Sequence, residues 1–269
     1  IILIVPDSLS HTAERLLAEN LGGTGINGCS ALTFHQMIRH FLPPQSRHIT
    51  DTGKRMLLYK AASGCSLQDN SFAAIMTKPG FLDSMSELIC EFKRYEISPD
   101  ELHNAAERTE NTLLSSKLSC ISEVYGRYTS LFREGGFSDN EDDLSKISEI
   151  FIENKYFKDK SVIIMGFDEL LPINVSVIES IIRTCEDISV ILPESRENNS
   201  ELFSRCEKAA DSLIACCSKN GIGINYESDT AQPEKAAELL FLARNFESEK
   251  NVFENECSTI SISESMSIY

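Results

Sequence analysis

The sequence predicts an α/β protein with a parallel sheet that is interrupted by a long all-helical segment. Two apolar runs, Ile1–Val5 and Val162–Met165, have the composition of buried strands. After residue 160, strand-like and helix-like segments alternate, which is the order that builds a parallel sheet with right-handed crossovers. Residues 51–159 show only helical periodicity. We therefore expect one sheet built from two distant parts of the chain.

The first 50 residues contain two strand–helix units. Ile1–Val5 is a strand, and a helix with an apolar side follows from Ser10. Residues 29–32 form a second short strand. Thr33 follows it as the N-cap of a helix with apolar residues at helical spacing.

The middle of the chain, residues 51–159, is expected to be a helical insertion. Ser98-Pro-Asp-Glu101 combines a capping box with proline at the first helical position. Leu113–Phe132 is a long amphipathic stretch. Asp139–Asp143 places acidic side chains at a helix start, where the helix dipole favours them.

The rest of the chain reads as alternating strands and helices. The expected strands are residues 162–165, 188–192 and 222–226, and the expected helices are residues 173–183, 201–218 and 234–246. Residues 1–50 and 160–257 then form one discontinuous α/β domain around the insertion at 51–159. Because the chain begins and ends inside strand-like runs, we expect a piece of a longer protein, with residues 258–269 leading into a further domain.

Composition narrows the class of protein. Nine cysteines without a C-x-x-C pair predict reduced thiols and a cytoplasmic location. No apolar run approaches the roughly 20 residues that span a bilayer, so no membrane partner is expected. The formal net charge is −16. Binding to a polyanion would therefore require a local basic patch.

The loop after the run Val162–Met165 is the most suggestive site for chemistry. Asp168 and Glu169 lie just beyond this strand, near the place where a nucleotide hydrolase holds magnesium with a Walker B acid. However, Met165 occupies the end of the run, where that acid normally stands. No G-x-x-x-x-G-K-[ST] phosphate loop occurs in the 269 residues. A helix-capping role for the two acids is the simpler interpretation, and no catalytic or metal-binding residue is predicted.

Two other stretches are candidates for binding. Leu32-Thr-Phe-His-Gln36 contains His35 at the end of a strand, although no cysteine or serine lies at a useful spacing for catalysis. Glu91-Phe-Lys-Arg-Tyr95 places Lys93 and Arg94 beside aromatic residues, a combination that can bind single-stranded nucleic acid. The alternatives are a helix cap at Thr33 and a solvated helix face at Lys93 and Arg94.

Seven short segments in the same order resemble the B subunit of AddAB-type helicase–nucleases of low-GC Gram-positive bacteria. They are V-P-D-S-L-S-H-T-A-E from Val5, L-T-F-H-Q-M from Leu32, K-P-G-F from Lys78, E-F-K-R-Y from Glu91, K-L followed by Tyr125 from Lys117, D-N-E-D from Asp139 and G-F-D-E-L-L-P from Gly166. The segment at Leu32 is also similar to the T-F-H-S-F motif of superfamily 1 helicases. The similar segments fall within residues 1 to about 195.

The resemblance implies a fold like the first motor domain of a superfamily 1 helicase, a P-loop-helicase-like domain that has lost its motor function. It implies DNA end processing in recombinational repair, with the A subunit and DNA as partners. Ser10, Thr33, His35, Lys93 and Arg94 become the candidate DNA contacts, and Met165, Asp168 and Glu169 a vestigial Walker-B-like site. No cofactor is expected in this piece. ATP with magnesium and an iron–sulfur cluster belong to the longer parent.

Two other functions are compatible with the sequence. One is an active ATP-hydrolysing motor whose phosphate loop precedes Ile1. The other is a protein-binding module without a DNA role, which the net charge of −16 favours.

Overall fold

The computed structural model describes residues 1–20, 28–42, 47–65, 75–193 and 204–227. Its sheet has four parallel strands in the order β2-β1-β3-β4. The strands are β1 (Ile2–Ile4), β2 (Ser30–Leu32), β3 (Ser161–Met165) and β4 (Asp187–Ile191). The expected α/β class is confirmed. A single sheet does join strands from before residue 50 to strands from after residue 160.

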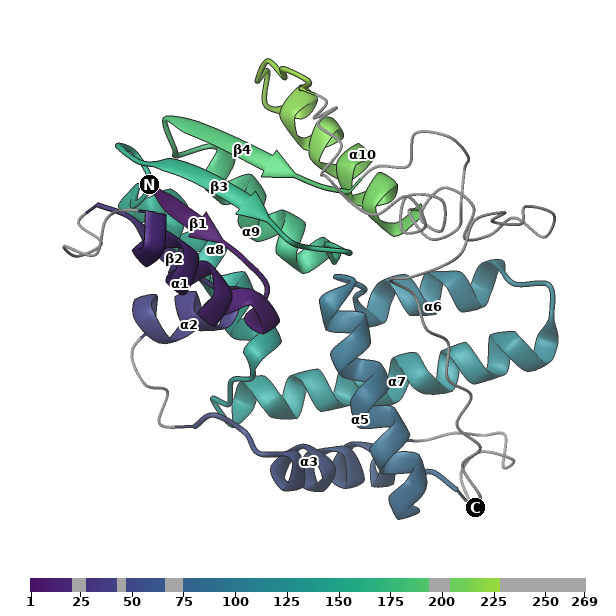
Figure 1. The fold of residues 1–269 in the computed structure, drawn as a ribbon. Helices are drawn as coiled ribbons and strands as arrows, with labels where there is room; N and C mark the ends of the chain where they lie inside the picture. Colours follow the sequence, from purple (N-terminus) through teal and green to yellow (C-terminus); the bar gives the residue numbers. More distant parts are fainter. Residues whose placement is uncertain (21–27, 43–46, 66–74, 194–203, 228–269) are drawn as a thin grey trace, which may run out of the picture.

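Helices cover both faces of this sheet (Figure 1). On one face, α1 (Ser10–Asn20) packs Ala13 against Val5 and Ala31. The other face packs against a larger group of helices. They are α2 (Phe34–Phe41), α8 (Asn140–Asn154), α9 (Pro172–Ile182) and α10 (Ser204–Lys219). The sheet is therefore enclosed as parallel sheets usually are, between layers of helices.

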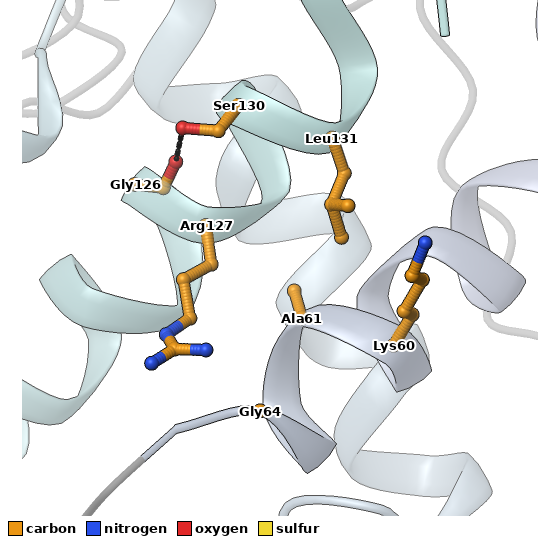
Figure 2. Close-up of a pocket in the computed structure, with 7 residues that line it drawn as sticks. All are labelled: Lys60, Ala61, Gly64, Gly126, Arg127, Ser130 and Leu131. Carbon is orange, nitrogen blue, oxygen red and sulfur yellow. Dashed lines mark hydrogen bonds between the residues drawn. The ribbon is translucent and has the colours of Figure 1, made fainter. Parts of the chain in front are cut away.

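The described helices between α2 and α8 have a hydrophobic core of their own. They are α3 (Asp51–Ser63), α5 (Pro79–Arg94), α6 (Pro99–Arg108) and α7 (Thr112–Glu134). Leu58, Met85, Val124 and Tyr128 are among the residues buried between them. In Figure 1, α3 lies on the far side of α7 from the sheet, and α3 and α7 border the surface hollow drawn in Figure 2.

The two predicted helix starts in this region, at Ser98 and at Asp139–Asp143, are confirmed. Ser98 and Glu101 form a reciprocal capping box at α6, which starts with Pro99. Asp139 caps α8, and its side chain accepts a hydrogen bond from the Asp142 N–H. Apart from an isolated bridge between His48 and Ser138, the described residues between β2 and β3 are helical or irregular.

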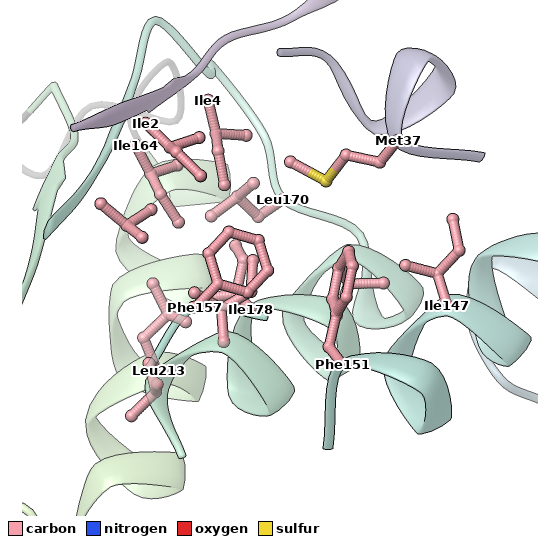
Figure 3. Close-up of a cluster of buried hydrophobic side chains, with 14 of the residues drawn as sticks. Ile2, Ile4, Met37, Ile147, Phe151, Phe157, Ile164, Leu170, Ile178 and Leu213 are labelled. Carbon is pink, nitrogen blue, oxygen red and sulfur yellow. The ribbon is translucent and has the colours of Figure 1, made fainter. Parts of the chain in front are cut away.

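The larger core lies under the sheet and draws on segments far apart in sequence (Figure 3). Ile4 and Ile164 are fully buried neighbours on adjacent strands. From the helical side come Phe151 of α8 and Phe157, which are also fully buried. Residues of the expected insertion at 51–159 thus contribute to both cores.

One strand prediction is wrong. Residues 222–226 are described and form no strand. Gly221 adopts a left-handed conformation at φ +68°, and the Ile222 N–H donates to the Cys217 carbonyl at 2.9 Å, the six-residue closure that ends helices. Ile222 therefore completes the end of α10, and Tyr226 is 74% exposed. The predicted helix at 234–246 and strand at 258–262 lie outside the described residues.

None of the helices in the described ranges combines the length and the apolar character that crossing a bilayer requires.

Candidate functional site

The carboxyl ends of three strands meet at one edge of the sheet, the edge where open α/β sheets bind their ligands. The chain leaves β1 into the short helix η1 (Asp7–Leu9) and α1, leaves β2 into α2, and leaves β3 into the loop at Gly166. Gly166 has φ +83°, and a Cβ there would come within 2.6 Å of Leu9 Cδ1. The positive φ favours glycine here, and the first loop packs directly on the third.

Ser10 and Thr33 are brought together at this edge through Gln36. Thr33 Oγ1 accepts from the Gln36 N–H at 3.2 Å, and Gln36 Oε1 accepts from the Thr33 N–H at 2.9 Å. The Gln36 amide then donates to Ser10 Oγ at 3.2 Å. Thr33 and Ser10 are both buried, with exposed fractions of 1% and 7%. Gln36 was missed in the sequence, although T-x-x-Q before an apolar run is a signal for a capping box.

Of the three predicted contacts at this edge, Ser10, Thr33 and His35, only His35 is exposed. It lies in the first turn of α2, in the turn that the cap residue Thr33 opens. The N–H groups of a first helical turn have no partner within the helix and carry partial positive charge. Two helices, α1 and α2, begin at this edge. An anionic group placed beside His35 would therefore meet backbone donors as well as the imidazole.

The helix-capping role predicted for Asp168 and Glu169 is wrong, because Leu171 is the N-cap of α9 and no side chain caps that helix. The loop after β3 is instead tied to the start of α10. Glu169 Oε2 accepts from Arg205 at 3.0 Å, and the Asp168 carbonyl accepts from the Cys206 thiol at 2.7 Å. Burial raises the pKa of the Cys206 thiol, and the negative charges of Asp168 and Glu169 add to this effect. Met165 ends β3 with 39% of its surface exposed. Within the described ranges, no group of three or more His, Cys, Asp or Glu side chains is arranged to hold a metal ion.

Lys93 lies at the end of α5, in an ion-pair network with the start of α8. Its ammonium donates to Asp139 Oδ2 at 2.8 Å and to Asp142 Oδ2 at 2.9 Å, and it lies 4.4 Å from the centre of the Phe132 ring. Arg94 Nε donates to Glu141 Oε1 at 3.1 Å. The Lys93 side chain is only 12% exposed. DNA contact by Lys93 and Arg94 stays a prediction, and these carboxylates compete with it.

The pKa values of the two aspartates around Lys93 are shifted in opposite directions. Burial favours the neutral form of Asp139, but the Lys93 ammonium, the Asp142 N–H and Lys54 outweigh it and lower the pKa of Asp139. For Asp142, burial and the adjacent Asp139 charge raise the pKa, despite the contact with Lys93. Lys54 Nζ lies 3.6 Å from Asp139 Oδ2 and closes the network on the α3 side.

The comparison with known families decides the classification. A family model described as "ADDB, N-terminal" matches residues 1–243. The chain belongs to this AddB N-terminal family. The match covers the sheet, the helical region and every candidate residue named above.

Curated relatives support the assignment at modest identity. The chain is 25% identical over 283 residues to the B subunit of the ATP-dependent helicase/deoxyribonuclease of Thermoanaerobacter sp. (strain X514), covering 100% of this chain and 24% of that protein. It is 28% identical over 288 residues to the protein of the same name from Clostridioides difficile (strain 630), covering 100% and 25%. The Listeria innocua protein of this name is 28% identical over 254 residues, covering 90% and 22%. The chain thus spans about a quarter of the length of these relatives.

Proposed function

We propose that this chain is the N-terminal part of the non-motor B subunit of a cytoplasmic helicase–nuclease that processes DNA ends for recombinational repair. The observation that carries the proposal is the AddB N-terminal family match over residues 1–243. In the proposal, this part of the subunit provides a scaffold, a surface for the A subunit and a path for one DNA strand. It performs no chemistry of its own.

We also propose that the chain is a helicase-like α/β domain with an inserted helical subdomain. The α/β part, residues 1–50 and 160–257, corresponds to the first motor domain of a superfamily 1 helicase, and residues 51–159 to a helical subdomain inserted between β2 and β3. The separate core of α3, α5, α6 and α7 supports this division. Helix α8 packs on α2 and α9 as well, so we assign it the role of joining the subdomain to the sheet.

We place the DNA strand at the carboxyl edge of the sheet. His35 is exposed there, and the start of α2 at Phe34 supplies backbone donors for phosphate oxygens. The Ser10 N–H at the start of α1 is already bonded to the Asp7 carbonyl. Gln36 holds the two helix starts together through Ser10 and Thr33. Such a site would bind the backbone of a strand without needing a strongly basic protein.

The residues after β3 do not fit a magnesium–nucleotide site. Met165 replaces the acid at the strand end, and Glu169 is paired with Arg205. No step through ATP, magnesium or an iron–sulfur cluster is therefore assigned to these residues. We propose that such groups, if the parent uses them, are held by other parts of it.

The experiment is a fluorescence-anisotropy titration of the chain with a single-stranded dT 15-mer at low salt. We expect His35→Ala to lose a contact worth about 1 kcal/mol, or roughly fivefold in affinity. His40→Ala is the matched control, because His40 is exposed near the other end of the same helix. Equal affinities for both variants and the wild type would contradict a strand at this edge.

One observation favours a second function. The net charge of −16 suits a module that binds only protein. Co-purification with the A subunit, combined with no measurable affinity for the dT 15-mer, would support this alternative.

A further inference from the structure

A surface hollow of about 410 Å³ lies between α3 and α7, away from the sheet edge. It is lined by Lys60, Ala61 and Gly64 of the α3 segment and by Gly126, Arg127, Ser130 and Leu131 of α7. Figure 2 shows the two cationic side chains on opposite sides of the small residue Ala61. The hollow therefore has a mainly apolar floor between two positive charges.

Both charges are available to a ligand. Among the described residues, Lys60 has no ion-pair partner, and its side chain is exposed. Arg127 pairs with Glu123 through Nε, at 3.5 Å, and is 44% exposed. The guanidinium carries four further N–H donors on its terminal nitrogens, which can meet a second acceptor. The two cations lie on either side of Ala61, on a chain with a net charge of −16.

Gly64 helps to position Arg127. A Cβ at Gly64 would lie 2.5 Å from Arg127 Nη1, so the guanidinium occupies the space of the missing side chain. The backbone of Gly64 is ordinary, with φ −91° and ψ −9°, and would accept other residues. A side chain at this position would therefore have to displace the guanidinium.

An apolar side chain continues the surface beside Lys60. Met56, which is 70% exposed, lies one helical turn before Lys60 on α3. The ring of Tyr59, on the same helix, is 53% exposed. Proteins that bind single strands without sequence preference combine cations for the phosphates with such platforms for the bases. An acidic peptide would use the cations but would gain little from the exposed ring.

We infer that the α3–α7 hollow binds the phosphate backbone of single-stranded nucleic acid, with Lys60 and Arg127 contacting separate phosphates on either side of the Ala61 floor. The inference rests on the proposed function, because it gives the DNA strand a second contact, distant from the sheet edge. It assigns a binding role to residues that carry no functional signal in the sequence.

The test measures dT 15-mer affinity by anisotropy across a salt series. For the double variant Lys60→Gln/Arg127→Gln, loss of two phosphate contacts should reduce the slope of log affinity against log salt by about 1.4. Lys117→Gln, an exposed lysine on the same helix α7, should leave the slope unchanged. Gly64→Ala keeps both charges but displaces the guanidinium, so we expect weaker binding from this variant as well.

The outcomes separate this inference from the proposed function. An unchanged slope in the double variant, together with weaker binding by His35→Ala, would overturn the inference that the hollow binds DNA. The proposed DNA site at the sheet edge would remain. No binding of the dT 15-mer by the wild type would overturn both. Binding of a decaglutamate peptide that depends on Lys60 and Arg127, without a change in the DNA slope, would show that the hollow accepts acidic protein and would also overturn the inference. Circular dichroism melts establish that each variant is folded.

Discussion

Replacing Lys93 with methionine should destabilise the protein by about 3 kcal/mol. Methionine keeps most of the side-chain volume and the contact with Phe132 but removes the ammonium between Asp139 and Asp142. Breaking a buried ion pair from one side costs about 3–5 kcal/mol, since the other charge stays buried. Lys54 still lies near Asp139, and Asp142 is 34% exposed, so we expect the lower end of this range.

The destabilisation should shrink in acid. The lowered pKa of Asp139 stabilises the wild type above the unfolded value near 4, and this contribution is lost as the pH falls through the folded pKa. Without Lys93, both carboxylates bind protons more readily in the folded state. Protonation then removes the unpaired carboxylate charge from the variant at a pH where the wild type is still stabilised by its ion pairs. The stability difference should therefore narrow as the pH falls through about 4 towards the lowered pKa of Asp139.

Urea denaturation at several pH values measures both effects. Arg94→Met is the matched control, because Arg94 is the next residue but is 52% exposed, and its pair with Glu141 should be worth about 1 kcal/mol or less. Equal losses for the two variants, or a difference independent of pH, would refute the assigned network. The double variant Lys93→Ala/Arg94→Ala also tests DNA contact. A flatter salt dependence of DNA binding would support contact by these residues, and an unchanged slope would show that they form only the ion pairs.

Three further substitutions test the local structure by urea denaturation. Gln36→Ala removes the reciprocal cap and the bond to Ser10, and should cost about 1–2 kcal/mol; an unchanged stability would contradict the link between the two helix starts. Ser98→Ala should cost about 1 kcal/mol, and threonine at the same position should recover most of it. Phe151→Ala should cost about 3–5 kcal/mol, because the ring is fully buried. Ile152→Ala is the control, because Ile152 is 43% exposed and its loss should cost no more than about 0.5 kcal/mol. Similar losses of stability at both positions would contradict the assignment of Phe151 to the core.

The fold could be predicted largely from local patterns, namely apolar runs and helix caps. The apolar runs around Ile4 and Ile164 identified strands that pair with each other across more than 150 residues of sequence. Caps such as Ser98 and Thr33 were identified because their bonds are formed within one helical turn. The alternation at residues 222–226 was misread, since the left-handed turn at Gly221 uses Ile222 to end a helix.

Contacts between distant residues could not be predicted in the same way. Nothing in the segment Glu91–Tyr95 indicates that Lys93 meets Asp139, 46 positions away. The hollow between α3 and α7 likewise depends on how two helices pack, which brings Lys60 near Arg127. At the sheet edge, the sequence identified Thr33 and Ser10 but not the Gln36 amide that joins them.

Hydrogen exchange of the chain, with and without the dT 15-mer at low salt, tests the central claim most directly. A strand along the carboxyl edge should slow exchange at the backbone amides of residues 7–11, 33–37 and 166–169. These segments begin α1 and α2 and follow β3. Slower exchange in these three segments is the predicted result. Oligonucleotide binding that leaves all three unchanged would contradict a DNA site at this edge.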